Sequence, residues 1–337
     1  MKMWYWIIIG IAIILVIIYF LGPKPPKPKF NNTLPKLTTD LQQLQSKINA
    51  EENNKPLRQD NEARIKFFDS SKSKTKYSII YMHGFAASYR DGYPVNQNSA
   101  DRLGANIYYN RMPGHGLRAP YSLDDFTAEN AWQDAKMDLV IGKNLGEKVI
   151  IMSTSTGGTL ATKLAAEFPE DIFALIHLSP NFEDDQAGAS ILGSHWGYKI
   201  ANLITLGKDR KIKQKTAAEK QYWDTSYNSR ALVDLQVLVG TTMKEETFQK
   251  VKCPVLTLYY SDNELQEDDH VEVDAIPKIL KQFSTPKNLN VLKRLQTQET
   301  HFIGSEIKSK DIESVEEEIV DFLRTKLNIK ILPKPNN

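Results

Sequence analysis

The sequence predicts an α/β protein with a mostly parallel central sheet, helices on both faces of the sheet, and one transmembrane helix ahead of it. Short apolar runs typical of buried parallel strands alternate with helical patterns along the chain. One of these runs, 149–152, is joined to the following helix by a serine- and glycine-rich turn. An uncharged apolar segment, Trp4–Leu21, lies near the amino terminus. Together these features predict a membrane helix followed by a strand-and-helix domain.

The segment Trp4–Leu21 is about long enough to cross the hydrocarbon core of a bilayer as a helix. Aromatic residues at both of its ends suit the two membrane interfaces. A cleaved signal peptide is the alternative, but only Lys2 precedes the segment and no small-residue cleavage site follows it. We therefore expect a retained single-pass membrane anchor. Lysines 24, 27, 29 and 36 outweigh Lys2, which predicts a cytoplasmic globular part, although a domain on the outer side remains open.

Composition limits the classes of function to consider. The chain has 337 residues, of which 41% are hydrophobic, enough for one large α/β domain or two small ones. Its formal net charge is +2 with acids and bases interleaved, so we expect no nucleic-acid partner. Cys253 is the one cysteine, which excludes a disulfide framework and a thiolate metal cluster.

The turn after the strand 149–152 contains the candidate nucleophile. It reads Ser-Thr-Ser-Thr-Gly-Gly over 153–158, and a helical pattern follows it. A serine on such a turn projects from the backbone, and the glycines after it let the helix approach the sheet. The helix N-terminus favours an oxyanion beside Ser155. The pattern is G-x-S-x-G with Ser153 in place of its first glycine, and an ordinary strand-to-helix turn is the alternative.

Two loops earlier in the chain supply further candidates. The strand 77–82 runs into His83-Gly84-Phe85, and serine hydrolases take one oxyanion N–H from such a loop and another from the residue after the nucleophile. Phe85 and Thr156 fit these two places, and we expect His83 to shape the loop. His115, between two glycines after the strand 107–109, rivals the later histidine as catalytic base, and we favour a structural turn there.

These motifs, in this order, carry a resemblance. His-Gly-Phe after a strand, R-x-P-G-H-G further on, and a strand ending in S-x-S-x-G-G resemble the α/β-hydrolase superfamily. The similarity is greatest to its carboxylesterase and monoglyceride-lipase-like branch and covers about 62–327. It implies an α/β-hydrolase fold with a helical cap inserted after the strand 173–178.

The resemblance also implies the other two catalytic residues. The family places its general base on the loop after the last strand, here 289–295, which identifies His301. It places its acid on the loop after the strand 254–260, where Asp268 best matches the family spacing after a short insertion. Asp262 lies nearer the strand end and is the alternative acid. The order Ser, Asp, His is the order of α/β-hydrolases.

The predicted function is acyl transfer to water by a membrane-anchored serine hydrolase that cleaves carboxylic esters, which the anchor and an apolar cap suggest are lipid-derived. Ser155, His301 and Asp268 form the triad, and no metal or organic cofactor is needed. A peptidase or thioesterase on the same triad is one alternative. The other is a membrane-tethered binding protein that kept the fold without turnover.

The predicted organisation has five parts. They are a transmembrane anchor (4–21), a Pro/Lys-rich linker (22–36), a short helical lead-in (37–61), the α/β-hydrolase domain (62–328, with the cap at about 181–250), and a tail (329–337). We expect the linker to be an extended, solvated spacer that holds the domain off the bilayer. We expect the end of the tail to be disordered.

Overall fold

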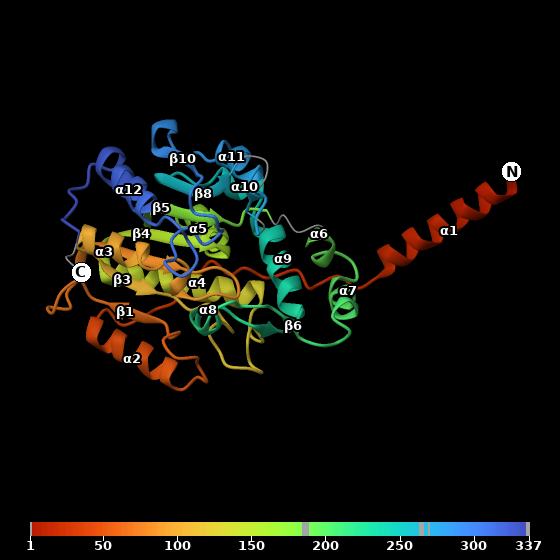
Figure 1. The fold of residues 1–337 in the computed structure, drawn as a ribbon, viewed down its shortest axis with the longest axis horizontal. Helices are drawn as coiled ribbons and strands as arrows, with labels where there is room; N and C mark the ends of the chain where they lie inside the picture. The colour runs from red at the N-terminus through yellow and green to blue at the C-terminus, as the bar shows by residue number, and fades with distance from the viewer. Residues whose placement is uncertain (1, 184–188, 263–265, 269, 335–337) are drawn as a thin grey trace.

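The structure, a computed structural model, describes residues 2–183, 189–262, 266–268 and 270–334 (Figure 1). Its centre is a sheet in the order β1-β3-β2-β4-β5-β8-β10, in which β1 pairs antiparallel with β3 and the other neighbours pair in parallel. A two-residue strand, β9, pairs antiparallel with the end of β8. The predicted mostly parallel sheet is confirmed. The strands are β1 (Arg64–Lys66), β2 (Thr75–Met82), β3 (Asn106–Tyr109), β4 (Gly146–Ser155), β5 (Ile172–Pro180), β8 (Val255–Asp262), β9 (Gln266–Glu267) and β10 (Asn290–Leu295).

Both faces of the sheet are covered because its strands are apolar on both sides. Consecutive residues of β2 point to opposite faces, and accordingly Ile79 and Ile80 belong to two different buried clusters. The cluster around Ile80 includes Trp132 of α4 and Leu160 of α5, and the other includes Phe322 after α12. The helices that cover the sheet include α3 (Val95–Leu103), α4 (Ala128–Leu145), α5 (Thr156–Glu167), α11 (Ala275–Leu280) and α12 (Glu313–Asp321).

A cap is inserted between β5 and β8, where the resemblance implies one. Its helix α9 contacts α4, α5 and α7, which ties the cap to the body. Two short strands, β6 and β7, pair antiparallel within it. In Figure 1, α6 and α7 lie at the end of the body from which α1 projects. The elements between β5 and β8 are α6 (Ala189–Leu192), α7 (Gly197–Ile204), β6 (Arg210–Lys211), α8 (Ala217–Tyr222), β7 (Ser226–Tyr227), α9 (Arg230–Thr242) and α10 (Glu245–Phe248).

The amino-terminal helix α1 (Lys2–Leu21) extends away from the body (Figure 1). By length and composition its segment Trp4–Leu21 is able to cross a membrane, and none of that segment is buried against the body. A signal sequence near the amino terminus satisfies the same criterion. The lead-in helix α2 (Leu41–Asn53) buries Leu44 and Ile48, as its apolar spacing predicts.

The linker is bound to the body, so the expectation of a solvated spacer is wrong. The indole N–H of Trp132 donates to the carbonyl of Asn31 at 2.9 Å, and Lys136 Nζ donates to the carbonyl of Thr33 at 2.8 Å. The Phe30 ring lies edge-on to the Trp132 ring at 6.3 Å between centroids. An extended, proline-rich backbone makes no internal hydrogen bonds and leaves its carbonyls free to accept these donors.

The tail also packs on the body as far as the structure describes it. Ile329 is buried, the Leu332 N–H donates to the Arg102 carbonyl at 2.8 Å, and Lys334 pairs with Glu316 at 2.6 Å. The sequence predicts disorder from Leu332 onward, and this expectation is therefore wrong for 332–334. Residues 335–337 lie outside the described part of the chain.

Candidate active site

Ser155 occupies a strained turn between β4 and α5. Its backbone has φ 53° and ψ −119°, a conformation that residues other than glycine rarely adopt and that costs on the order of 1–3 kcal/mol. The turn is tight because α5 begins directly at Thr156. A Cβ on Gly157 would lie 2.0 Å from the Met82 carbonyl oxygen, so only glycine fits there. The sequence pattern thus produces a sharply projecting serine.

Ser153, which replaces the first glycine of the motif, has a buried partner. Its hydroxyl oxygen lies 2.8 Å from Nδ1 of His177 on β5, and Thr162 of α5 approaches Nε2 of the same ring at 3.4 Å. Burial lowers the pKa of His177 to about 3 and keeps the ring neutral. The departure from G-x-S-x-G is accommodated by a hydrogen bond between neighbouring strands. The sequence analysis did not single out His177.

His301 and Asp268 form a buried hydrogen-bonded pair. Nδ1 of His301 lies 2.5 Å from Oδ2 of Asp268, so the ring donates its Nδ1 proton to the carboxylate. Oδ1 of Asp268 accepts the backbone N–H of His270 at 2.9 Å. Nε2 of His301 is buried without a hydrogen-bond partner among the described residues. The ring is thereby held in one orientation, with an unused acceptor nitrogen.

The alternative acid is placed elsewhere. Asp262 is exposed at the end of β8, where it pairs with Gln266 of β9 in a short antiparallel ladder. The structure brings Asp268 to His301 and leaves Asp262 outside this pair. The insertion that separates the two aspartates includes residues 263–265, which lie outside the described residues.

One cavity of about 840 Å³ contains the candidate residues together. Its lining includes Ser155, His301, Phe85 and Thr156. In the described part of the chain, the backbone N–H groups of Phe85 and Thr156 take part in no turn, cap or side-chain hydrogen bond. Two free N–H groups in the cavity that Ser155 lines are suited to an oxyanion.

The loop that includes Phe85 is held by a buried carboxylate. Oδ2 of Asp91 accepts the Gly84 N–H at 2.7 Å, and its Oδ1 accepts the Tyr81 hydroxyl. Burial raises the pKa of Asp91 to about 7, against these two hydrogen bonds. A Cβ on Gly84 would lie 3.0 Å from the Ser155 Cβ, so the loop passes directly beside the serine.

His83 and His115 have structural partners. The Met112 N–H donates to Nε2 of His83 at 3.1 Å, which leaves Nδ1 to donate to the Gly84 carbonyl at 2.8 Å. His115 Nδ1 lies 2.9 Å from the Pro113 carbonyl, and its ring contacts that of His83. Burial lowers the pKa of both rings to about 3. His115 is not among the residues that line the cavity of Ser155.

Further polar side-chain groups line this cavity, of which Asn181 and Trp223 were not predicted from the sequence. The side-chain atoms Asn181 Oδ1, Thr156 Oγ1 and Trp223 Nε1 line it and are buried without a hydrogen-bond partner among the described residues. Asn181 directly follows β5, and polar residues after the carboxyl ends of parallel strands are a usable signal for ligand contacts. His270 stacks on His301, with 4.8 Å between ring centroids and 10° between planes.

Asp268, His270 and His301 are the one group of possible metal ligands in the described part of the chain, with ligand atoms within 4.8 Å of one another. The Nδ1 proton of His301 already occupies the space between that ring and Asp268. A cation would have to displace this proton. The contacts therefore fit a hydrogen-bonded pair with a stacked ring better than a metal centre.

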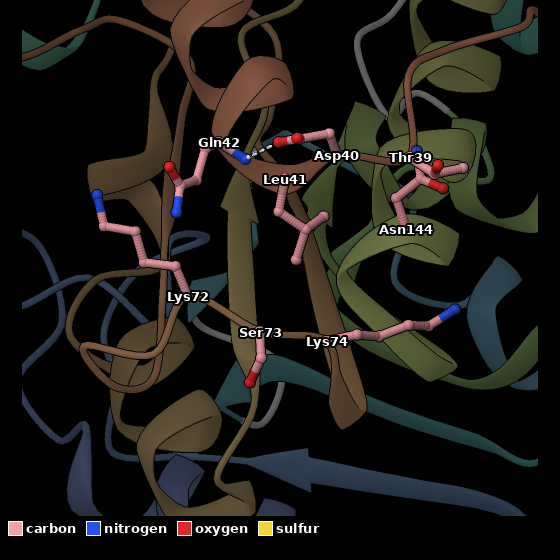
Figure 2. A pocket seen from close by; sticks show the side chains of 8 residues that line it. All are labelled: Thr39, Asp40, Leu41, Gln42, Lys72, Ser73, Lys74 and Asn144. Atoms are coloured by element: carbon pink, nitrogen blue, oxygen red, sulfur yellow. Dashed lines mark hydrogen bonds between the residues drawn. The ribbon is translucent and has the colours of Figure 1, made fainter.

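A shallower depression lies at the start of α2 (Figure 2). Its carboxylate, Asp40, is used as the helix cap, because Oδ1 accepts the N–H groups of Gln42 and Gln43. The other lining residues include Lys72, Ser73 and Asn144. Its acid is already bonded and its lining contains no histidine, so this depression lacks the arrangement found around Ser155.

Comparison with known proteins rests on structure. No family model matches the chain, and no curated protein matches its sequence. A structure described with LipS and LipT, two metagenome-derived lipolytic enzymes, is similar at 17% identity and TM-score 0.63, covering 80% of this chain and 99% of that one. A Paleococcus ferrophilus monoacylglycerol lipase is 13% identical, with TM-score 0.52 and coverage of 77% and 98%. Mouse alpha/beta hydrolase domain-containing protein 10 is 16% identical, with TM-score 0.53 and coverage of 79% and 94%. Together with the sheet order, the cap and the strained serine turn, these similarities show that the chain has the α/β-hydrolase fold.

Proposed function

We propose that the chain is a serine hydrolase that cleaves carboxylic esters through Ser155, His301 and Asp268. One observation carries the proposal: the hydrogen bond from His301 to Asp268 leaves Nε2 of the ring buried and unpartnered in the cavity that Ser155 lines. A nucleophile, a base and a group that orients the base are the parts this chemistry requires.

In the proposed mechanism Nε2 of His301 takes the hydroxyl proton as Ser155 Oγ attacks the ester carbonyl carbon. Asp268 keeps the Nδ1 proton in place and stabilises the charged ring. The tetrahedral oxyanion accepts the N–H groups of Phe85 and Thr156. Collapse breaks the bond to the alcohol, which leaves with the proton from Nε2. Water, deprotonated by the same nitrogen, then hydrolyses the acyl-enzyme and releases the acid.

We propose a lipid-derived ester as the substrate. The cavity has an apolar part, formed by Phe85 and by the cap residues Ile212, Leu232 and Leu235. Two of the similar structures are described as lipolytic enzymes and as a monoacylglycerol lipase, which supports an apolar acyl or alcohol group here as well. An apolar wall with a few polar groups at the reacting end is typical of such sites.

We propose that α1 is a retained anchor and that the body lies on the cytoplasmic side. The length of Trp4–Leu21 and the fact that none of it is buried support the anchor. The lysines of the linker that follows support the orientation.

The test compares hydrolysis of p-nitrophenyl butyrate by the full-length protein in detergent and by three variants. Ser155→Ala is expected to abolish turnover and labelling by a fluorophosphonate. Asp268→Asn is expected to lower kcat about 10³- to 10⁴-fold, because the ring loses its orienting carboxylate. The matched control Asp262→Asn, an exposed aspartate of the same loop region, is expected to leave kcat unchanged.

Other outcomes have defined meanings. Equal losses in Asp262→Asn and Asp268→Asn would contradict the assignment of the acid. A folded wild-type protein that neither turns over esters nor reacts with the fluorophosphonate would support the binding-protein alternative. Labelling of Ser155 with turnover of thioesters or peptides alone would keep the triad and change the substrate.

A further inference from the structure

The end of α1 is joined directly to the cap. We call this contact the seam, formed by residues 18–23 on one side and 194–196 on the other. The indole N–H of Trp196 lies 3.1 Å from the carbonyl oxygens of both Ile18 and Tyr19. The remaining hydrogen bonds of the seam are Tyr19 with Ser194 through their hydroxyls (2.8 Å), His195 Nδ1 to the Gly22 carbonyl (2.8 Å) and the Trp196 N–H to the Pro23 carbonyl (2.8 Å). Figure 1 accordingly shows α6 and α7 at the base of α1.

Beside the seam, the cap exposes large apolar side chains. Leu203, Ile204 and Leu206 are 72%, 73% and 78% exposed, more than any other large apolar residue in the described chain outside α1. Ile191 of α6 is 47% exposed. We call these four residues the cap patch. On α7, Ala201 is buried, whereas Leu203 and Ile204 at the end of the helix are exposed.

The backbone around Leu206 is held in an unfavourable conformation. Leu206 has φ 53° and Gly207 has φ 73°, so two successive residues are left-handed. This conformation is energetically unfavourable for a bulky residue such as leucine, whereas glycine adopts it readily. The turn ends α7, because the Gly207 N–H donates to the Asn202 carbonyl at 2.9 Å and the Leu206 N–H to the Leu203 carbonyl at 3.1 Å, and it leaves the leucine side chain 78% exposed.

The distance between the cap patch and the bilayer is set by the seam. The linker supplies no spacing, because it is bound along α4 through Asn31 and Thr33. The seam fixes the cap to the last residues of the apolar helix, at the level where that helix leaves the hydrocarbon. Lys199 and Lys208, which flank Leu203 and Leu206, are exposed and suited to lipid headgroups.

We propose that the cap patch inserts into the headgroup–acyl boundary of the bilayer that α1 crosses. The proposal rests on the proposed membrane anchor and goes beyond it, since it adds a second contact made by the catalytic body. The cap patch is close in sequence to residues of the candidate active site, because Arg210 and Ile212, a few residues after Leu206, line the cavity of Ser155. An ester in the membrane would reach the cavity beneath the cap.

The test measures the environment of nitroxide labels on the full-length protein in phosphatidylcholine vesicles. Cys253 is buried and burial raises its pKa to about 12, so introduced cysteines react selectively. Labels go on Leu203→Cys, Ile204→Cys and Leu206→Cys. Ile11→Cys, near the middle of α1, reports the anchor. Phe68→Cys is the matched control, an exposed apolar residue two positions after β1, and β1 lies on the side of the body away from α1 (Figure 1).

The expected result is that labels at 203, 204 and 206 collide with oxygen more than with a water-soluble nickel chelate, at a shallower depth than the label at 11. The label at 68 should favour the nickel chelate. Labels at 203–206 that behave like the label at 68, while the label at 11 is in lipid, would overturn the insertion and leave the anchor standing. A label at 11 in water would overturn both.

A second measurement tests the functional consequence. The triple variant Leu203→Ser, Ile204→Ser, Leu206→Ser should hydrolyse a vesicle-embedded ester several-fold more slowly than the wild type, with turnover of soluble p-nitrophenyl butyrate unchanged. Phe68→Ser should alter neither rate. An equal loss of turnover on both substrates in the triple variant would contradict a membrane role of the cap patch. A wild-type protein that does not hydrolyse soluble p-nitrophenyl butyrate would contradict the proposed function instead.

Discussion

Three interior histidines, His83, His115 and His177, are neutral because burial lowers their pKa to about 3. In the unfolded chain a histidine has a pKa of about 6.5, so between these two values the unfolded state binds more protons than the folded state. The free energy of unfolding therefore falls as the pH falls through this window, by up to about 1.4 kcal/mol per pH unit for each ring. Each of these rings makes the protein more sensitive to acid.

His177 allows this effect to be measured at a single residue. In His177→Gln the titrating ring is gone, while the amide can still bond Ser153. As the pH falls from about 6 to 4, the stability of the wild type relative to this variant should fall by about 1.4 kcal/mol per pH unit. Urea unfolding at several pH values measures the difference. Ser153→Ala, which keeps the ring, should retain the wild-type slope, and parallel profiles for wild type and His177→Gln would refute the assignment.

Individual residues show most clearly what could and could not be predicted from the sequence. Ser155 and His301 could be predicted as site residues because a short motif and the position after the last strand point to them. His177 is not, because its contact with Ser153 arises from the parallel register of β4 and β5, in which the two residues are opposite. The sequence favoured Asp268 over Asp262 as the acid without deciding between them, because local periodicity does not determine the path of an inserted loop.

At the level of elements, the strand-to-helix turn depends on close approach of backbones. α5 starts where it does because Gly157 has no Cβ to meet the Met82 carbonyl. Gly157→Ala should therefore shift the turn, lower stability and reduce esterase turnover together. Gly240 in α9 is the matched control, since a Cβ there meets nothing within 4 Å. Gly240→Ala should raise the free energy of unfolding by roughly 0.5–1 kcal/mol through helix propensity.

Urea unfolding and p-nitrophenyl butyrate turnover, measured on both variants, check this prediction. A Gly157→Ala protein with wild-type stability and turnover would contradict the close approach. A destabilised Gly240→Ala would instead point to a contact in α9 that the structure does not contain.

Elements were predictable where apolar spacing marks them. The strands of the main sheet and α4 follow from such patterns, and Thr127 caps α4 by accepting the Asn130 N–H. Helix α3 was not predicted, because its inward face mixes polar residues with Val95, Ala100 and Leu103. Gln97 of α3 accepts the Tyr109 hydroxyl at 2.6 Å and Asn96 donates to the Tyr89 carbonyl at 3.0 Å. Buried polar residues that are satisfied by such hydrogen bonds interrupt the apolar spacing by which a helix is recognised in a sequence.

At the scale of the whole molecule, the bound linker determines how the body sits relative to α1. Fully extended, the fourteen or so residues after α1 would allow a separation of about 46–50 Å. The structure uses none of this length, because Phe30 packs on Trp132 and under the ammonium of Lys163 at 4.7 Å. Composition suggested a spacer, since proline and lysine favour extended, solvated chain, but it contains no information about the surface of α4.

Phe30→Ala should release the linker from the body. The edge-to-face contact with Trp132 contributes about 1 kcal/mol, so its loss should raise the population of detached linker about fivefold. The rate of cleavage by trypsin in vesicle-bound protein measures the population of detached linker. The bonds after Lys24 and Lys27 precede proline and resist cleavage, whereas the bond after Lys29 precedes Phe30 and can be cut. The variant should be cut after Lys29 about fivefold faster, with the new amino terminus at residue 30 identified by mass spectrometry. Phe68→Ala, which removes an exposed ring elsewhere, should leave that rate unchanged. Equal rates in wild type and Phe30→Ala would mean that the linker is free in solution, and the seam would then be the contact, among the described residues, that joins the body to α1.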